Sequence, residues 1–597
     1  MSTLDGYISN TAEKAGEEAL AAVFFALEEG HNFKLEAGAG AGKTYSLIQA
    51  LKYILERKSS YLPRSDQRVA CLTYTKVARD EIVARTDDSP FVFADTLHGF
   101  LWEMIRPFQK SLQASLLRSE AWAELLEEGD EINEKLIDYD LGFRSISEEK
   151  IALHHDDIPI FAIELFRNPK FRALITDRFP IIFIDEYQDT PAGLAESMLP
   201  GDSTGQLSPV LGFFGDHWQQ IYDRTCGSID HPTLTSIPKN ANFRSTRSIV
   251  SFLNNLRPEL AQTPAADAAQ GSVTIYHTNE WPGTRLGRQW KGQISHEATR
   301  ACLSWLNSGS STGEHSSDAE TSKILMLTHT TIANELGYSA LPKVFNRNDA
   351  FIRKEDPIIE YLIDTIEPAL GSFGKRHYGD LFDILGGRRP ILGSPQDKVL
   401  WNEFFHQLIS TSENGTIGDM LDLLVNQSLF ALPTRVEKRE RDLKEALKAL
   451  NLGEELKEPQ RLVEHKKLRA VAYAEIRALN GYLSDSTVFS TKHAVKGAEF
   501  DDVVVVLGRG WSKYNFSQML SNYPTRDDLY GKERSSFERS RNLFYVAASR
   551  AKHNLSLLFV QKLDDSALST LTEWVGGENI VSIGFVDETT PSLTLKT

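Results

Sequence analysis

The chain has 597 residues, more than one hydrophobic core usually holds, so we expect two to four domains. Hydrophobic residues make up 41% and charged residues 25%, as in an ordinary folded protein. The net charge of −17, from 65 basic and 82 acidic side chains, argues against unspecific adhesion to nucleic acid and confines any such site to a local groove. No apolar run approaches the about 18 residues of a membrane span, and the start "MSTLDGYISN" shows no secretion signal, so we expect a cytoplasmic protein without membrane contact. The three scattered cysteines argue against a disulfide framework or a structural zinc or iron–sulfur site.

The first motif in the chain is the glycine-rich stretch "FKLEAGAGAGKTYSL", Phe33 to Leu47. Its "FKLE" predicts a strand and the residues from Lys43 onward predict a helix. Glycines between the two let backbone N–H groups turn inward around phosphate oxygens, while Lys43 supplies a charge for the β and γ phosphates and Thr44 a ligand for Mg²⁺. The start of the helix adds its own positive end. The expected cradle comprises Ala37, Gly38, Ala39, Gly40, Ala41, Gly42, Lys43 and Thr44, with alanine at position 37 where the strict pattern has glycine.

The second motif, "FPIIFIDEYQDT", places an apolar run, Ile181 to Ile184, directly before two acids. Such a run is typical of a strand buried on both faces of a parallel sheet. Alone it could equally be a strand ending at a solvated acidic turn. Beside a phosphate cradle, Asp185 suits orientation of a nucleotide-bound metal through water, and Glu186 suits alignment of an attacking water. The pair therefore predicts a nucleotide hydrolysis site that uses ATP and Mg²⁺.

Further motifs lie between and after these two, in a fixed order along the chain. They are "CLTYTKVARDEIVAR" (Cys71 to Arg85), "FADTLHGF" (Phe93 to Phe100), "FFGDHWQQIY" (Phe213 to Tyr222), "NFRST" (Asn242 to Thr246), "STKHAVKGAEFDDVVVV" (Ser490 to Val506) and "RSRNLFYVAASRAKHNL" (Arg539 to Leu555). In this order, from about Phe33 to about Leu558, the chain resembles the UvrD/Rep/PcrA group of superfamily 1 helicases. The resemblance implies an ATP-dependent DNA helicase acting on single-stranded or partly duplex DNA.

The resemblance also implies roles for single residues. Arg244 and Arg550 match the two arginines that meet charge on the γ phosphate, for which guanidinium is suited because it keeps its proton, and Gln219 matches the residue that senses that phosphate. Contacts to the nucleotide are implied for Tyr45, Arg85, Phe243 and Glu499, of which Phe243 matches the aromatic that stacks on the base and Glu499 the ribose contact. Bases stacked on aromatics and backbone contacts hold single-stranded DNA, and the matching positions are Tyr74, Thr75, Thr96, His98, Tyr222, Thr491 and His493.

The chain departs from the family pattern at several positions. No glutamine precedes Gln49, so the residue that reads adenine in relatives is missing and the nucleotide preference stays open. Tyr45 stands where relatives often have arginine, which suggests an aromatic sandwich with Phe243 around the base. Trp218 lies inside its motif without an expected partner, and Asn542 replaces an arginine next to Arg541. Hydrolysis is expected to survive these changes.

The expected architecture is α/β: two RecA-like P-loop domains with parallel sheets, each carrying a helical insertion. The expected boundaries are 1–100 and 180–262 for the first domain, 101–179 for its insertion, 271–370 and 487–597 for the second domain, and 371–486 for its insertion. The preferred hypothesis is a 3′ to 5′ single-stranded DNA translocase that unwinds duplexes in repair, replication or phage defence. An alternative is a nucleotide-gated subunit of an anti-phage complex with a partner nuclease, because the compact layout resembles the helicase subunit of Gabija systems.

Overall fold

The computed structural model divides the chain into two compact units, Met1–His315 with Lys496–Thr597, and Ser316–Val495. It describes residues 11–593 except 124, 127–131, 133–134, 140–143, 148, 201–207, 221–224, 308–321, 327–331, 334–335, 346–350, 353, 355, 386–393, 428–431, 452–459, 485–488, 491–497 and 510–513. Among these residues, no helix is long and apolar enough to cross a membrane. The second unit begins before, and ends after, the insertion expected at 371–486.

The first sheet of the larger unit is a six-stranded parallel sheet with strand order β3-β2-β7-β8-β1-β9. Its strands are β1 (Asn32–Ala37), β2 (Val69–Thr73), β3 (Val92–Thr96), β7 (Ile181–Asp185), β8 (Val210–Gly215) and β9 (Leu234–Lys239). In β2, Val69 and Cys71 join one apolar cluster while Ala70 and Leu72 join another, because successive side chains point to opposite faces. The sheet is therefore buried on both faces, as the continuous apolar run in β7 predicts.

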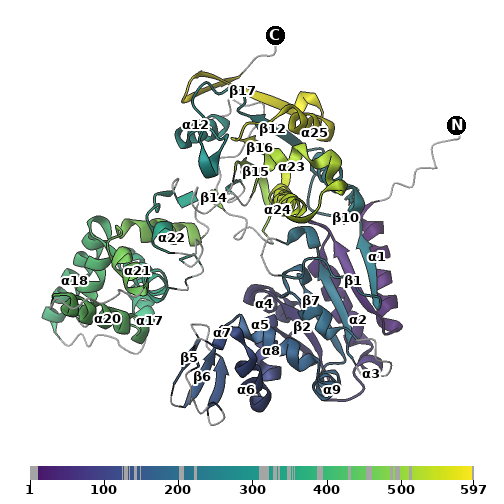
Figure 1. Ribbon diagram of the computed structural model, residues 1–597, viewed down its shortest axis with the longest axis horizontal. Helices are drawn as coiled ribbons and strands as arrows, with labels where there is room; N and C mark the ends of the chain where they lie inside the picture. The colour runs from purple at the N-terminus through teal and green to yellow at the C-terminus, as the bar shows by residue number, and fades with distance from the viewer. Residues whose placement is uncertain are drawn as a thin grey trace. The chain divides into compact units, whose positions relative to one another are not determined.

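Helices cover both faces of this sheet. Helix α1 lies beside β1 and, with α2, packs on one face, and α5 and α8 belong to the cluster on the other (Figure 1). The helices of this part are α1 (Ala12–Glu28), α2 (Lys43–Glu56), α3 (Lys58–Tyr61), α4 (Lys76–Arg85), α5 (Leu97–Ile105), α6 (Gln109–Arg118), α7 (Glu120–Ala123), α8 (Asp157–Phe166), α9 (Pro169–Arg178), α10 (Leu194–Met198) and α11 (Arg247–Leu256). A two-stranded pair of β10 (Ala241–Asn242) and β11 (Thr263–Pro264) follows.

The segment 101–179, expected to be helical, also contains a small sheet. Its strands β4 (Leu136–Tyr139), β5 (Ser145–Ile146) and β6 (Lys150–Leu153) pair in the order β4-β6-β5. Ile137, Ile151 and Leu153 turn into the same apolar cluster as α5 and α8. These short strands lack the long apolar periodicity that signals an element in a sequence, which is why only the helices were expected.

The second sheet of the larger unit has the strand order β15-β16-β12-β17-β18. The strands are β12 (Ser272–His277), β15 (Phe500–Leu507), β16 (Ala551–Phe559), β17 (Ile580–Asp587) and β18 (Thr590–Leu593), of which only the last pairing is antiparallel. Helices α12 (His296–Asn307), α23 (Phe516–Ser521), α24 (Gly531–Ala548) and α25 (Asp565–Val575) belong to this part. Parallel sheets with interleaved helices confirm the expected α/β class.

The smaller unit is mainly helical. It contains the parallel pair β13 (Ser322–Met326) and β14 (Phe489–Ser490). Its helices are α14 (Leu341–Val344), α15 (Pro357–Tyr361), α16 (Glu367–Gly374), α17 (Tyr378–Leu385), α18 (Pro395–Asn414), α19 (Ile417–Gln427), α20 (Thr434–Asn451), α21 (Gln460–Arg469) and α22 (Ala474–Leu483), with a π-helical turn, Leu362–Ile366, between α15 and α16.

Candidate nucleotide site

The glycine-rich loop joins the carboxyl end of β1 to the start of α2, as predicted. Gly40 and Gly42 have φ angles of 75° and 74°, which residues with a side chain rarely adopt. A Cβ at Gly40 would lie 2.7 Å from the Asn242 side-chain oxygen and 2.8 Å from Cβ of Arg244. Among the described residues, no side chain caps α2 and no acid lies in its first turn, so its N-terminal N–H groups face an open anion site.

The two predicted acids lie at the end of β7, on the same edge of the sheet as the loop. The Lys43 ammonium donates to Glu186 over 3.1 Å, which brings the predicted phosphate cation and water-aligning base into direct contact. Glu186 has a φ of 49°, and its backbone N–H donates to the Asp185 carboxylate over 3.0 Å. The Gln188 amide donates to the same Glu186 oxygen over 2.5 Å. This left-handed turn aims the acid back toward the loop, and a positive φ in a residue other than glycine is often found at functional sites.

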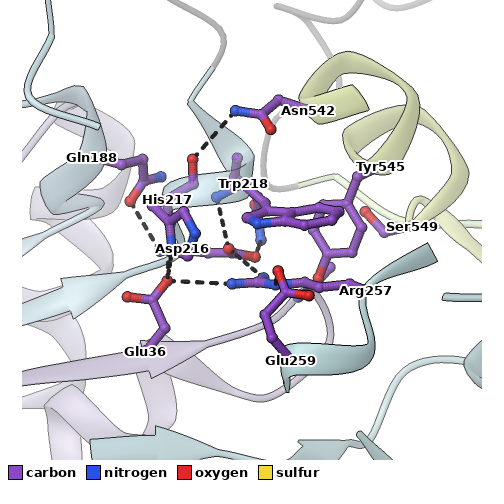
Figure 2. Close-up of polar contacts among 12 residues, drawn as sticks. Glu36, Gln188, Asp216, His217, Trp218, Arg257, Glu259, Asn542, Tyr545 and Ser549 are labelled. Carbon is purple, nitrogen blue, oxygen red and sulfur yellow. Dashed lines mark hydrogen bonds and ion pairs between the residues drawn. The ribbon is translucent and has the colours of Figure 1, made fainter. Parts of the chain in front are cut away.

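Gln219, the predicted γ-phosphate sensor, is held by a buried ion pair. It belongs to the short helical turn η3 (His217–Gln219), and its side chain donates to Asp216 over 2.9 Å. Arg257 donates to the same carboxylate over 2.6 Å, and both charged side chains are at most 2% exposed (Figure 2). Although burial opposes the charged form, Asp216 holds the pKa of Arg257 above its usual range. Because Asp216 is charged and fixed, the amide of Gln219 is held in one orientation.

Glu36 extends this network to β1. It accepts from the Tyr187 hydroxyl over 2.5 Å and from His217 at the backbone N–H (3.0 Å) and ring Nδ1 (2.6 Å). Burial opposes ionisation of this carboxyl, but these donors lower its pKa from 4.5 to about 2. Ligand atoms of Glu36, Asp216 and His217 lie within 4.8 Å of one another, close enough for a metal ion. The Arg257 guanidinium already occupies the position between the two carboxylates, so the group is an ion-pair cluster (Figure 2).

The two predicted γ-phosphate arginines lie beside one another at the second sheet. Arg244 donates to Glu499, the predicted ribose contact, over 2.8 Å, and to the backbone oxygen of Ser549 over 3.1 Å. Arg550 is fully buried and donates to the backbone oxygen of Val546 over 2.9 Å. Burial, followed by the like charge of Arg244, lowers the pKa of Arg550 to about 9. Such crowding of cations favours a bound anion.

The predicted base-stacking residues, Tyr45 and Phe243, are 55% and 47% exposed, unusually high for large aromatic side chains. The ammonium of Lys239, which ends β9, lies 5.9 Å and 5.8 Å from the two ring centroids. It donates to the Gly42 carbonyl over 3.1 Å and to the Ser46 hydroxyl over 2.7 Å. Burial lowers the pKa of Lys239 to about 8. Both rings thus lie within about 6 Å of a lysine that no sequence motif indicated.

Predicted DNA-contacting residues gather at the ends of β2 and β3, whose register pairs Thr73 with Thr96. Tyr74 is 44% exposed, and Thr75 caps α4 by accepting from the backbone N–H of Ala78 over 3.2 Å. Thr96 caps α5 in the same way, through the Gly99 N–H over 3.1 Å.

His98, in the first turn of α5, stacks on His155 with ring centroids 3.5 Å apart. Burial, with the neighbouring His155, lowers the pKa of His98 to about 3, so its ring is neutral at physiological pH. A neutral ring offers stacking and hydrogen bonding and no charge to a phosphate backbone.

Trp218, which had no expected partner, contacts α24. Its ring centroid lies 3.7 Å from the Arg541 guanidinium carbon and 5.0 Å from that of Arg257. The Tyr545 ring meets it edge-on at 5.6 Å, and the Tyr545 hydroxyl accepts from the Ala39 N–H of the loop over 3.0 Å. These contacts give Trp218 the partners that its motif did not indicate.

Some predicted residues are not brought to this site or lie outside the described residues. Arg85 ends α4, is half-exposed and pairs with Glu81 over 2.7 Å, one turn earlier on the same helix. Tyr222, Thr491 and His493 lie outside the described residues.

Sequence reasoning missed Glu36, Lys239, Arg257 and Tyr545. Glu36 had a usable signal, an acid inside the strand before the loop, whereas the other three come near the loop only through folding.

The residues of the loop fit a magnesium-bound nucleotide. The evidence for this fit is the glycine cradle that a Cβ would fill, the uncapped start of α2 and a cation, Lys43, whose partner is an acid rather than a structural backbone group. Thr44, in the first turn of α2, and Asp185, at the end of β7, are the oxygen donors suited to the metal. Positive charge comes from Arg244, which follows β10, and from Arg550, which directly precedes β16.

Two family models match parts of this chain, and several curated proteins are similar to it. Residues 20–224 match a family model described as an AAA domain, and residues 423–562 match that of the UvrD-like helicase C-terminal domain. The chain is 22% identical over 683 aligned positions to the Gabija protein GajB of Bacillus cereus strain HuB5-5, covering 93% of this chain and 96% of that relative. It is 21% identical over 618 positions to the ATP-dependent DNA helicase PcrA of Staphylococcus aureus strain Mu50, covering 87% of this chain and 80% of that protein. The first family match contains the loop, the acids and Gln219, and the second contains Glu499, Arg541 and Arg550.

Proposed function

We propose that the protein is a Mg²⁺-dependent translocase on single-stranded DNA that separates duplexes in the 3′ to 5′ direction. The premise is that the matches identify the chain as a UvrD/PcrA-like helicase, an ATP-dependent enzyme that hydrolyses ATP. The observation that carries the proposal is the contact of Lys43 with Glu186 at the edge of the first sheet, with Gln219 fixed at the end of the neighbouring strand. Ligands bind at the carboxyl ends of such parallel strands.

The proposed roles follow from the chemistry of each group. Thr44 and Asp185 would hold a magnesium ion, which would supply neutralisation of the phosphate charge when bound. Lys43 leaves Glu186 for the phosphates, which frees the carboxylate to align and deprotonate a water. Gln219 orients toward the γ phosphate, and Arg244 and Arg550 stabilise charge that develops there.

Translocation follows if the two sheets grip the strand differently with and without nucleotide. We assign one grip to the edge formed by Tyr74, Thr75, Thr96 and His98. Tyr74 supplies an exposed ring for base stacking, worth about 1 to 3 kcal/mol per base. Tyr222, Thr491 and His493 are proposed as further contacts on the strength of the motifs.

ATP turnover with and without single-stranded DNA tests the proposal. The wild-type protein should hydrolyse ATP only with Mg²⁺ and faster with DNA, and Glu186→Gln should lower kcat by about a hundredfold or more, since it removes a general base. Glu56→Gln is the matched control, because Glu56 is an exposed acid at the far end of α2. Turnover that is indifferent to DNA, or equal in Glu186→Gln and Glu56→Gln, contradicts the proposal.

A second candidate function is favoured by the Gabija relative, which this chain matches over nearly its whole length. We propose that the protein also serves as the nucleotide-gated subunit of an anti-phage complex with a partner nuclease. Affinity purification from the native host should then recover a nuclease in stoichiometric amount, and the amount should differ between wild type and Glu186→Gln in the presence of ATP. A preparation free of any stoichiometric partner speaks against this second role.

A further inference from the structure

The proposed function assigns no role to Trp218 or to the contacts that its side chain makes. Its backbone N–H donates to Asp216 over 3.0 Å, and the backbone and side-chain amides of the next residue, Gln219, donate to the same Asp216 residue over 2.8 Å and 2.9 Å. Trp218 and Gln219 are therefore parts of one short, hydrogen-bonded turn. A movement of the Gln219 backbone would therefore move the turn that carries the indole.

The indole meets charged and aromatic groups from two parts of the chain. Arg257 follows α11, on the first-sheet side of the turn, and Arg541 and Tyr545 lie one turn apart on the same face of α24. The three groups lie 5.0 Å, 3.7 Å and 5.6 Å from the indole ring, measured between guanidinium carbon or ring centroid and indole centroid. Figure 2 shows the indole of Trp218 beside the Tyr545 ring and Arg257.

The same helix face also touches the phosphate loop. The Tyr545 hydroxyl accepts from the Ala39 N–H over 3.0 Å, and the Asn542 amide donates to the His217 carbonyl over 3.5 Å (Figure 2). Helix α24 then runs directly into Arg550 and β16. One rigid element therefore contacts the loop and the sensor turn and leads directly to the arginine proposed for the γ phosphate.

We propose that Trp218 is a positioning residue that couples Gln219 to α24 through its contact with Arg541. The inference rests on the proposed function, since it concerns how the second sheet, through α24, takes part in the DNA-stimulated turnover of that nucleotide site. The contact suits this task because a guanidinium is attracted to the face of an indole. The indole is 3% exposed, so the contact is shielded from salt.

The test measures the ratio of ATP turnover with saturating single-stranded DNA to turnover without it. Trp218→Leu should lower this ratio by about tenfold, within the range typical of coupling between sites, while Trp218→Phe, which keeps an aromatic face, should restore most of it. The KM for ATP should change less than kcat, because the indole contacts no predicted nucleotide-binding side chain. Trp281→Leu is the matched control: Trp281 is a buried tryptophan with a guanidinium carbon 5.9 Å from its ring, in the segment that follows β12.

A double-mutant cycle identifies the partner. Adding Arg541→Met to Trp218→Leu should lower the ratio no further, because both changes remove the same contact. Any of four outcomes overturns the inference. They are a wild-type ratio in Trp218→Leu, an equal loss in Trp218→Phe, an equal loss in Trp281→Leu, and full additivity with Arg541→Met. If DNA does not change the turnover of the wild-type protein, the proposed function itself is wrong. This result can be told apart from failure of the inference, because it is seen before any variant is compared.

Discussion

Three acids at the nucleotide edge of the first sheet differ in their partners. Asp216 is neutralised by the buried Arg257, whereas Glu186 pairs with Lys43, a cation that nucleotide phosphates would attract. Glu36 accepts hydrogen bonds from Tyr187 and His217. Glu186 is therefore the acid whose partner a phosphate would remove, which suits it to act as a base only when nucleotide is bound.

The first prediction concerns Glu36 and acid stability. Its pKa falls from 4.5 to about 2 on folding, so the unfolded chain binds the proton more readily and the carboxylate stabilises the fold above pH 4.5. This stabilisation, on the order of 3 kcal/mol from the shift, should be lost as the pH falls from 4.5 toward about 2. Melting temperatures of wild type and Glu36→Gln should thus differ most near neutral pH and converge in acid. A difference that persists unchanged at pH 3 contradicts this role.

The second prediction concerns Lys239, whose pKa falls from 10.5 to about 8 because it is buried. The unfolded chain holds this proton to higher pH, so stability should rise as the pH increases from about 8 to 10.5. Measured against Lys239→Met, the wild-type melting temperature should gain over this interval and stay constant relative to the variant below it. A melting temperature that does not change relative to the variant between pH 8 and 10.5 would show that Lys239 keeps its charge when folded.

At the scale of the element, the phosphate loop depends on left-handed backbone at two glycines. Gly40 and Gly42 turn the chain between β1 and α2, and a side chain at Gly40 would also meet Asn242 and Arg244. Strand β7 and helix α2 are the elements that sequence patterns predicted, and both are confirmed. The loop between β1 and α2 is what converts two ordinary elements into an anion site.

The third prediction separates conformation from crowding in this loop. Gly40→Ala should abolish nucleotide binding and lower the melting temperature, because its Cβ would lie 2.7 Å from an oxygen in addition to the φ strain. Gly30→Ala has a similar φ of 67° but nothing within 4 Å, so it should cost only about 1 kcal/mol. Isothermal titration with a non-hydrolysable ATP analogue and a thermal melt of each variant provide the comparison. Intact binding in Gly40→Ala would show that the loop tolerates a side chain there.

At the scale of the whole molecule, a protein with a net negative charge has to bind DNA, which is also negatively charged. The net charge of −17 makes stacking on rings such as Tyr74, together with local cations, the expected source of DNA affinity. Tyr74→Ala should therefore weaken single-stranded DNA binding by roughly tenfold, with little change in its salt dependence. Fluorescence anisotropy at several salt concentrations measures both quantities.

The fifth prediction concerns the direction of unwinding. We expect a duplex with a 3′ single-stranded overhang to be unwound with ATP, and one with a 5′ overhang or blunt ends to be left intact. A strand-displacement assay on the three substrates, with Glu186→Gln as the inactive control, gives the answer. Preference for the 5′ overhang would assign the opposite polarity and would leave ATP-dependent unwinding intact.

Local sequence alone determined the parts of the site that are contiguous in the chain. The glycines and Lys43 lie within a few residues of one another, and the acids follow one apolar run, so short-range backbone physics specifies them. The order of motifs likewise indicated an α/β helicase with parallel sheets, in agreement with the family matches.

Only the tertiary structure decided which distant residues share the site. Arg257 meets Asp216 across 41 positions, and Tyr545 meets Ala39 across 506. Trp218 gained its partners in the same way, since nothing near it in the chain predicts Arg541. A short motif reports the local conformation and chemistry of its own segment, whereas a contact of this kind depends on sheet order and on how α24 packs, which no single segment encodes.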